Sequence, residues 1–481
     1  MSTYEAIKQR YTKAGQEHVL HFYEELSEAE QGALLEQLDT IDVAELNGIF
    51  KTAVEAEKAT PDTDSISIEP PPASSVESLV ADPNKASGYR ERGLNAIKEG
   101  QVAVILLAGG QGTRLGSSAP KGAYDIKLPS GKSLFQLQGE RIKRLQTLAS
   151  GVLTWYVMTS GPTRKATEAF FVEHNYFGLA AQNVVFFQQG VLPCLTDDGK
   201  IFLETKSHVA VAPDGNGGIY AALRAPLETG KEGTVLSDMA SRGIRYLHAY
   251  CVDNCLAKVA DPVFVGYCIH AGAECGTKTV VKTHPDESVG VVALKNGKFN
   301  VIEYSEIPKE LAARKDGNQL AFRAANIANH FYTLEFLEKI ASFQKEMAYH
   351  VARKKIPHVS LENGREEKPS KPNGMKLELF IFDVLPFTEK MALLEVERKD
   401  EFSPLKNAPG SGSDCPETSR ADLLNQQKRW LEAAGAKLGD KEIEVSPLMS
   451  YEGEDLERLK GLIATTSGLL ETQEDIHKLF E

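Results

Sequence analysis

The sequence predicts an α/β protein in which a mostly parallel, or mixed, β-sheet is flanked by helices. From Val102 onward, short apolar runs alternate with stretches that carry helical hydrophobic spacing. The apolar runs lack hydrophobic–polar alternation, which is typical of strands buried on both faces. Strands that alternate with helices in this way favour a parallel sheet, and such sheets bind ligands at the carboxyl ends of their strands.

Residues 1–100 are expected to form a helical N-terminal region with a proline-rich linker. Apolar residues recur at near-helical spacing within 2–58, at Leu20, Phe22, Leu26, Leu34, Leu35 and Leu38. The stretch "ATPDTDSISIEPPPASS" (59–75) breaks this pattern and predicts a linker or an extended arm that crosses a surface. A helix follows at 83–99, with Asp82 as N-cap and Gly100 as its stop.

The large α/β domain is expected over 101–385. Its first two strands, 102–108 and 155–160, are followed by helices near 134–149 and 163–173. Further strands are expected at 184–187, 246–252 and 291–294. Beyond residue 385 the pattern weakens: a strand leads into a loop, a helix follows at 420–435, and the rest indicates a small α+β domain over 386–481.

Composition excludes several classes of protein. The chain has 54 Lys and Arg against 67 Asp and Glu, so its net charge of −13 disfavours a nucleic-acid partner, although a local cationic pocket remains compatible. The six cysteines lack zinc-binding spacing and indicate reduced thiols. Because the chain contains neither a signal core nor a long apolar stretch, we expect a cytoplasmic protein without a membrane partner.

The glycine-rich stretch "LAGGQGTRLGSSAPKG" (107–122) follows the first strand and indicates a phosphate-binding loop. A Walker loop that ends in Gly131–Ser133 would need its first glycine at position 126, where Ile126 stands. A dinucleotide fingerprint that starts at Gly110 fails because Leu115 occupies the third glycine position. The second failure also disfavours an NAD-dependent oxidoreductase.

The residues of this loop suit a triphosphate that must release pyrophosphate. Gly109, Gly110 and Gly112 allow the backbone amides to approach a nucleotide closely. Arg114 offers a planar fork for phosphate oxygens, and Lys121 adds a movable point charge. The loop alone therefore predicts nucleotidyl transfer, without specifying the base or the acceptor.

Other polar stretches are also candidates. Gln189 follows a strand, where its amide can read a uracil edge or belong to an ordinary polar loop. Asp253 ends the strand of "YCVDN", where it can bind a divalent metal or cap the strand. Phe380 and Phe382 are expected on one side of a strand, as core packing or as an apolar wall. The paired carboxylates of "EYSE" (303–306) suggest a glycosidase, which has no use for a cationic phosphate loop.

Taken in order, these stretches resemble the nucleoside-triphosphate sugar-1-phosphate nucleotidyltransferases. The match is to the eukaryotic UDP-sugar pyrophosphorylases, in the form that acts on N-acetylglucosamine 1-phosphate, and it covers nearly the whole chain from about residue 80. It implies a Rossmann-like, glycosyltransferase-A-like nucleotidyltransferase core. Besides the glycine loop, it rests on "TSGPTRKATE", "FFQQGVLPC", "APDGNGGIY", "YCVDN", "EYSEI", "NIANHF", "KPNGMKLELFIFD" and "EFSPLKN".

The resemblance also implies roles for individual residues. It implies catalytic roles for Arg114, Lys121 and Lys406. It implies nucleotide contacts for Leu107, Ala108, Gly109, Gly110, Gln189, Gly215 and Asp253, with Asp253 also holding Mg²⁺ or Mn²⁺. It implies sugar contacts for Asn216, Gly290, Glu303, Tyr304, Asn326, Phe380 and Phe382. The chain departs from the family at Ala325, where a glycine is expected; a methyl group at a glycine turn would displace Asn326.

The expected activity is that of a UTP:N-acetyl-α-D-glucosamine-1-phosphate uridylyltransferase. UTP and N-acetylglucosamine 1-phosphate would form UDP-N-acetylglucosamine and pyrophosphate in an enzyme that is a monomer or a weak homodimer. Two alternatives remain: a UDP-glucose or UDP-galactose pyrophosphorylase, and a non-catalytic nucleotide-sugar sensor on the same fold. The retained cations Arg114, Lys121 and Lys406 disfavour the sensor, which need not stabilise a leaving group.

Overall fold

The computed structural model describes residues 3–58, 67–227 and 232–481, which fall into two compact units. Each unit is described by itself below. The first, called unit 1, consists of the described residues of Met1–Ile66, Gln189–Ala222 and Ser342–Asp383. The second, called unit 2, consists of the described residues of Ser67–Gln188, Leu223–Ala341 and Val384–Glu481.

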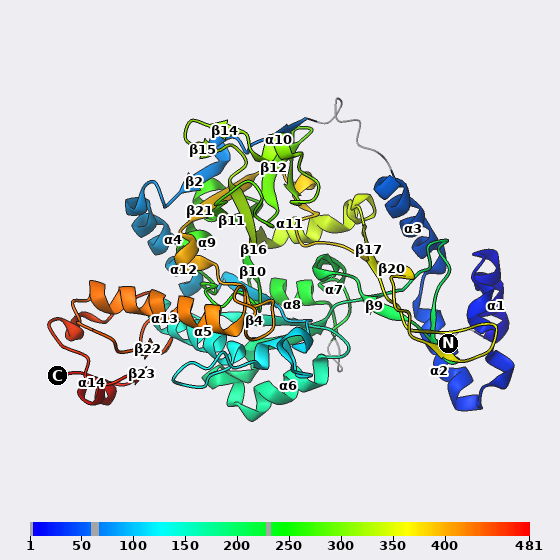
Figure 1. Cartoon of the computed structure of the whole chain (residues 1–481), viewed down its shortest axis with the longest axis horizontal. Helices are drawn as coiled ribbons and strands as arrows, with labels where there is room; N and C mark the ends of the chain where they lie inside the picture. Colours follow the sequence, from blue (N-terminus) through cyan, green and yellow to red (C-terminus); the bar gives the residue numbers. More distant parts are fainter. Residues whose placement is uncertain (1–2, 59–66, 228–231) are drawn as a thin grey trace. The chain divides into compact units, whose positions relative to one another are not determined.

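Unit 2 is built on a mixed sheet of eleven strands (Figure 1). Its strands are β1 (Ile68–Glu69), β2 (Val76–Ser78), β3 (Val102–Leu107), β4 (Thr154–Thr159), β5 (Val184–Gln188), β10 (Tyr246–Cys251), β11 (Cys275–Val281), β12 (Val291–Lys295), β13 (Lys298–Ile302), β16 (Ala324–Thr333) and β21 (Met391–Val396). The principal order is β2-β21-β11-β16-β10-β3-β4-β5. The run β10-β3-β4-β5 is parallel, so its strands all end at one edge, which we call the carboxyl edge.

Within the principal order, strand β16 runs antiparallel to both neighbours, β10 and β11. Its amino-terminal residues therefore lie at the carboxyl edge, where the parallel strands end. The register pairs Tyr250 of β10 with Asn329 of β16. Beyond this pair β16 is irregular, since its register with β11 shifts between Thr277 and Thr279, and Asn326 lies near the carboxyl edge.

Helices cover both faces of the sheet, as the fold class requires. They are α4 (Ala86–Lys98), α5 (Leu134–Ala149), α6 (Arg164–Glu173), α8 (Val235–Ser241), α9 (Pro262–Ala271), α10 (Lys309–Ala312), α11 (Leu334–Lys339), α12 (Arg398–Glu401) and α13 (Pro416–Ala433). Helices α4 and α9 lie side by side (Figure 1), and a Cβ added at Gly93 would meet the carbonyl oxygen of Pro262 at 1.9 Å. Glycine at this position therefore permits the close helix approach.

The C-terminal residues of unit 2 form a small α+β substructure. Strands β22 (Ile443–Val445) and β23 (Gly468–Leu470) pair in parallel beside α13 and α14 (Gln473–Leu479). They enclose an apolar cluster of their own that includes Leu431, Val445 and Leu470. The expected α+β character of this region is thus confirmed.

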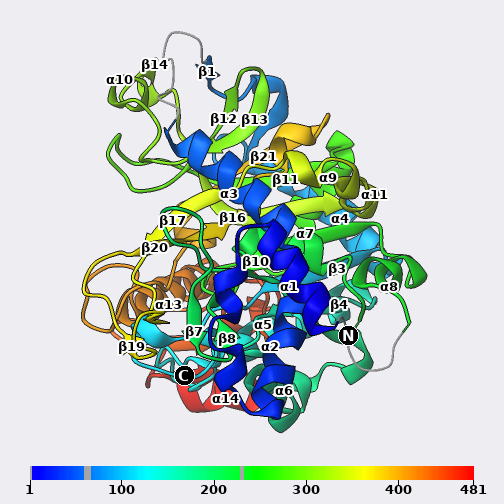
Figure 2. The same cartoon turned by 90° about the vertical axis from the view of Figure 1, so that its right-hand side faces the viewer.

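Unit 1 contains the N-terminal helices and several two-stranded sheets (Figure 2). Its elements are α1 (Tyr4–Lys13), α2 (Glu28–Thr40), α3 (Val43–Lys58), α7 (Ile219–Ala222), β6 (Val191–Pro193), β7 (Leu203–Thr205), β8 (His208–Val209), β9 (Val211–Pro213), β17 (His350–Lys354), β18 (His358–Val359), β19 (Glu366–Glu367) and β20 (Gly374–Glu378). Ile7, Leu34 and Leu46 of the helices share one buried cluster with Val209 and Met375 of the strands. The helices thus pack on residues far away in the sequence.

Most expected elements lie within a few residues of their predicted places. The helix predicted at 420–435 begins earlier, at Pro416, because Cys415 provides the N-cap and proline suits the first turn. Of the predicted linker, 67–75 form an arm whose β1 pairs with β12, while 59–66 lie outside the described residues. The domain limits 100 and 385 stay a prediction, although β21, beyond 385, is a strand of the large sheet.

Candidate active site

The glycine-rich loop leaves the carboxyl edge directly after β3 and folds back on itself. Lys121 N donates to Gly110 O at 3.1 Å, and Gly112 N donates to Ala119 O at 3.0 Å. Ser160, which follows β4, donates its hydroxyl to Gly109 O at 2.6 Å. These bonds hold the loop in a defined shape.

Two positively charged side chains adjoin one carboxylate beside this loop. Lys121 Nζ lies 3.0 Å from Asp253 Oδ2, and their side chains are 17% and 25% exposed. Leu405 N donates to Asp253 O at 2.8 Å, which brings the exposed Lys406 to the end of β10. Burial and Asp253 raise the pKa of the Cys251 thiol to about 12, against the opposing effect of Lys406 and Lys121. The three charged groups therefore surround the end of this strand.

Arg114 lies on the same loop, in a 3-10 turn over Thr113–Leu115. Its side chain is exposed, and among the described residues no carboxylate lies within ion-pair distance of it. Glycine at position 122 has a packing reason, since an added Cβ would lie 2.2 Å from the Phe135 ring. Gly110 differs, because within the described part of the chain nothing lies within 4 Å of an added Cβ.

Asp253 is the residue at this edge best suited to a divalent cation. No group of three or more His, Cys, Asp or Glu side chains that could hold a metal occurs within 3–58, 67–227 and 232–481. Mg²⁺ in phosphate-transfer sites takes one or two carboxylates and completes its shell with phosphate oxygens and water. A single carboxylate paired with Lys121, the lysine expected to bind phosphate, fits such an ion.

Three of the expected sugar-binding residues are brought together in unit 2. A Cβ added at Gly290 would lie 2.9 Å from Glu303 Oε1, so this glycine leaves room for the carboxylate. Asn326 N donates to Gly290 O at 2.9 Å. Tyr304, next to Glu303, is 54% exposed. Glu303 and Asn326 thus lie on either side of one glycine.

The expectation of a glycine turn before Asn326 is wrong. Ala325 lies within β16, fully buried, and pairs with Val280 and Val291. The irregularity comes later, at Ala328, whose φ is 52° and whose amide donates to Asn326 Oδ1 at 3.1 Å. A methyl group at 325 therefore packs in the sheet, and the Asn326 side chain is held by the backbone that follows it.

Unit 1 brings the expected uridine-binding residues together. Gln189 is 7% exposed, and its Nε2 donates to Gly215 O at 3.2 Å and to Asp214 Oδ1 at 3.4 Å. Gly215 has a φ of 87°, and a Cβ there would lie 2.2 Å from Leu379 O, so only glycine fits. Asn216 Oδ1 accepts a hydrogen bond from Ile381 N at 2.9 Å. This turn is thus fixed against residues 379–381.

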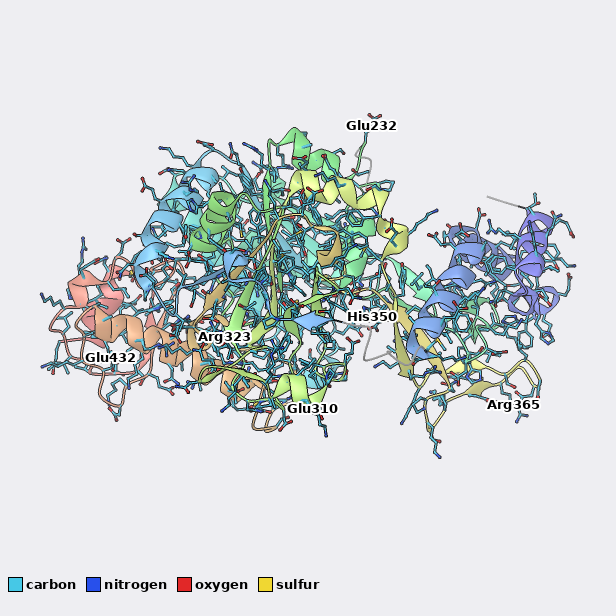
Figure 3. The ribbon with its side chains drawn as sticks, turned by 90° about the horizontal axis from the view of Figure 1, so that it is seen from above. Glu232, Glu310, Arg323, His350, Arg365 and Glu432 are labelled. Carbon is cyan, nitrogen blue, oxygen red and sulfur yellow. The ribbon has the colours of Figure 1, made fainter. Side chains whose placement is uncertain are left out.

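Phe380 and Phe382 do not lie in a strand, contrary to expectation. Strand β20 ends at Glu378, and Phe382 belongs to the turn that follows. The chain turns because Asp383 Oδ2 accepts from Phe380 N at 2.7 Å. The two rings are still 5.2 Å apart, and the ring of His350, labelled in Figure 3, stacks on Phe380 at 4.3 Å.

The sequence of the chain is similar to those of known sugar-nucleotide enzymes. The model of the family described as UTP--glucose-1-phosphate uridylyltransferase matches residues 7–441. The UDP-N-acetylglucosamine pyrophosphorylase of Saccharomyces cerevisiae is 47% identical over 477 residues, which cover 96% of this chain and 98% of that protein. The chain belongs to the UDP-N-acetylglucosamine pyrophosphorylase family.

Two further members of the pyrophosphorylase family support this assignment. The UDP-N-acetylhexosamine pyrophosphorylase-like protein 1 of Xenopus tropicalis is 44% identical, over 94% of this chain and 93% of its own length. The crystal structure of the UDP-N-acetylglucosamine pyrophosphorylase of Trypanosoma brucei, solved with an inhibitor, has a TM-score of 0.83. It is 34% identical to this chain and covers 95% of both. The nucleotidyltransferase fold expected from sequence is therefore confirmed.

Several residues of the site had no expected role. Asp214 lies within the "APDGNGGIY" stretch, which predicts no role for it, and the sequence predicts none for His350 and Asp383, which lie 3.0 Å apart. The only sequence signal for Asp214 was its place beside Gly215, since burial of a loop carboxylate is set by distant chain segments.

Among the described helices, none is long and apolar enough to cross a membrane.

Proposed function

We propose that this protein is a UTP:N-acetyl-α-D-glucosamine-1-phosphate uridylyltransferase that forms UDP-N-acetylglucosamine and pyrophosphate. The observation that carries the proposal is the ion pair between Lys121 of the glycine-rich loop and Asp253, whose backbone also binds Leu405, the residue before Lys406. Such a group of charges suits two anionic substrates and a leaving polyanion. The identity of 47% to a protein of that name supports the choice of sugar.

The proposed reaction is an in-line attack of the sugar-1-phosphate oxygen on the α-phosphorus of UTP. The new bond joins that oxygen to the α-phosphorus, and the bond to the β-phosphate oxygen breaks to release pyrophosphate. The nucleophile is already ionised at neutral pH, so no general base is required. Catalysis then consists of positioning and of charge stabilisation by preorganised groups.

Each cation has a distinct role in this proposal. Arg114 and Lys121 stabilise the charge that develops on the departing pyrophosphate, Arg114 through its fork and Lys121 as a point charge. Lys406 neutralises the repulsion between the sugar phosphate and the nucleotide. Asp253 would hold Mg²⁺ or Mn²⁺, which when bound neutralises phosphate charge. Lys121 keeps the Asp253 carboxylate in place at 3.0 Å.

The remaining residues select the substrates. Leu107, Ala108, Gly109 and Gly110 present backbone to the nucleotide, while Gln189 and Gly215 contact the uracil ring. Glu303 accepts hydrogen bonds from sugar hydroxyls, and Asn326 also hydrogen-bonds to the sugar. Gly290 leaves room for the Glu303 carboxylate. Asn216 and Tyr304 also contact the sugar, and Phe380 and Phe382 form an apolar wall for the N-acetyl methyl group.

A sugar-phosphate panel tests the proposal. The protein is incubated with UTP and Mg²⁺ and with N-acetylglucosamine 1-phosphate, glucose 1-phosphate or galactose 1-phosphate, and pyrophosphate release is measured. We expect the highest kcat/KM with N-acetylglucosamine 1-phosphate. A preference for glucose 1-phosphate would instead favour the activity in the description of the matching family. Binding of UDP-N-acetylglucosamine without pyrophosphate release from any sugar would identify a sensor.

A further inference from the structure

Asp214 is a buried carboxylic acid to which the proposed reaction assigns no task. It is 8% exposed, and burial raises its pKa to about 7, against the effect of hydrogen bonds from the backbone and Gln189. Two glycines make room for it: an added Cβ would lie 1.8 Å from its Oδ1 at Gly218 and 2.8 Å from its Oδ2 at Gly190. The surrounding chain is thus shaped around this carboxyl group.

The carboxyl group determines which end of the Gln189 amide faces the protein. Asp214 Oδ1 and Gly215 O are both hydrogen-bond acceptors, and they lie 3.4 Å and 3.2 Å from the same terminal atom of Gln189. That atom must therefore be the amide nitrogen, because an oxygen there would face two other oxygens. Both N–H groups of Gln189 are then directed at the protein, and only Oε1 remains to meet a ligand.

We propose that Asp214 is a positioning residue that, with Gly215 O, locks the Gln189 amide so that the site accepts uracil and rejects cytosine. This inference rests on the proposed function only in taking Gln189 as the residue that reads the base. Uracil carries a hydrogen on N3, which an amide oxygen can accept. Cytosine carries a lone pair at N3, which would face the oxygen of Gln189 without a proton between them.

The lock is firmest when Asp214 is ionised, because a carboxylate offers only acceptor oxygens. A neutral carboxylic acid keeps a carbonyl oxygen that can accept from Gln189 but also gains an O–H that can donate to a rotated amide, whereas Gly215 O selects the amide nitrogen in both states. Without Asp214, only Gly215 O holds the amide nitrogen. Rotation of the amide would present N–H to cytosine N3. In the wild-type protein this rotation breaks two hydrogen bonds, whereas without Asp214 it breaks only one.

The test compares kcat/KM for UTP and for CTP in Asp214→Ala, Asp214→Asn and the wild-type protein. Asp214→Ala removes the acceptor, and we expect the UTP-to-CTP ratio to fall by about tenfold, the worth of one hydrogen bond. Asp214→Asn keeps the shape and one acceptor oxygen but adds an N–H donor that can meet a rotated amide, so we expect its ratio to lie between those of the wild type and Asp214→Ala. Asp197→Ala, which removes a carboxylate that is 70% exposed in the same unit, serves as control and should leave the ratio unchanged.

The ratio separates positioning from a structural role. If Asp214 only supported the fold, its removal would lower kcat/KM for UTP and CTP equally, and an unchanged ratio overturns the inference. If Asp214→Ala does not fold, the wild-type protein is titrated with UDP and with 3-deaza-UDP, in which C–H replaces N3–H. We expect 3-deaza-UDP to bind about tenfold more weakly, and equal binding overturns the inference.

Failure of the proposed function would be recognised separately. UDP and CDP binding can be measured by calorimetry without a sugar phosphate, so base selection is tested even in a protein that turns over none of the sugar phosphates. Strong preference for UDP with no pyrophosphate release would leave the inference intact while refuting the uridylyltransferase activity. Release of pyrophosphate from UTP and CTP at equal rates by the wild-type protein would refute the inference about base selection while leaving a nucleotidyltransferase activity intact.

Discussion

Replacement of Lys132 by Met tests whether a buried ion cluster stabilises the segment that follows the glycine-rich loop. The Lys132 side chain is 8% exposed, and its Nζ lies 2.7 Å from Glu140 Oε2 and forms a second ion pair with Glu471. Burial lowers the pKa of Lys132, but its bonds to these carboxylates outweigh that effect and raise it overall. Methionine matches the apolar part of the side chain as far as Cε and removes the ammonium group with its hydrogen bonds.

The expected loss of stability depends on the two carboxylates that remain without their lysine. Glu140 is 5% exposed and would lose its cation, retaining a hydrogen bond from Gln136 at 2.9 Å, whereas Glu471 is 30% exposed and can be hydrated. Breaking a buried pair by removing one partner costs about 3–5 kcal/mol, and the partial exposure of Glu471 favours the lower end. At about 2 °C per kcal/mol for a large chain, Lys132→Met should lower the unfolding temperature on the order of 5 °C.

Lys127 provides the matched control, because it lies in the same segment but is 81% exposed and paired with Asp125 at 3.0 Å. Lys127→Met should leave the unfolding temperature unchanged within error. Scanning calorimetry of both variants measures the difference, and Lys132→Met combined with Glu140→Gln should recover part of the loss by removing the uncompensated charge. Equal shifts in the two methionine variants would refute the reasoning.

Four other predictions concern single residues. Arg114→Ala should lower kcat by roughly 10²–10³-fold with an unchanged unfolding temperature, and near-normal turnover would contradict its role. Gly110→Ala should raise the KM for UTP without loss of stability, whereas Gly122→Ala, whose Cβ would lie 2.2 Å from a buried ring, should lower the unfolding temperature; the reverse pattern would sink both assignments. Asp253→Asn should raise the Mg²⁺ concentration needed for half-maximal turnover, and an unchanged titration would argue against metal binding there. Burial lowers the pKa of His330 from 6.5 to about 3, so this residue binds a proton in the unfolded chain before it does so in the native state. The free energy of unfolding should therefore fall by about 2 kcal/mol as the pH drops from 6.5 to 5. His330→Phe should flatten this pH dependence in denaturant titrations, and an unaltered slope would show that another group causes it.

The strands and helices of the sheet are predictable from sequence because each is specified locally. β3 and α5 lie at their predicted places since an apolar run and a helical period need no knowledge of distant residues. Phe380 and Phe382 illustrate the limit. Their spacing resembles a strand, but the chain turns there because Asp383 accepts from Phe380 N, a bond that competes with strand pairing.

The division of the chain into two units is harder to predict from sequence, because it depends on contacts between distant segments. The described residues of 1–66, 189–222 and 342–383 share unit 1, where Leu46 and Met375 meet in one buried cluster. Apolar residues at either position indicate burial, but nothing in the local pattern states against which segment each is buried. The composition of "PDGNGG" likewise indicates a turn, whereas the burial of Asp214 within it depends on Gly190, which lies outside the turn.

The reversed strand β16 explains how one edge of a sheet can bear both phosphate-binding and sugar-binding residues. In a purely parallel sheet, every segment at the carboxyl edge is a loop that leaves a strand, as at Gly110 and Asp253. Because β16 runs the opposite way, a segment enters the sheet at this edge, and Asn326, near the start of β16, lies there. Asn326 therefore gains a strand-anchored backbone, through its bond to Gly290 O, that a loop residue would lack. The sequence pattern of β16 shows an apolar strand but carries no sign of its direction, and the direction is what places the expected sugar residue at the same edge of the sheet as the expected phosphate residues.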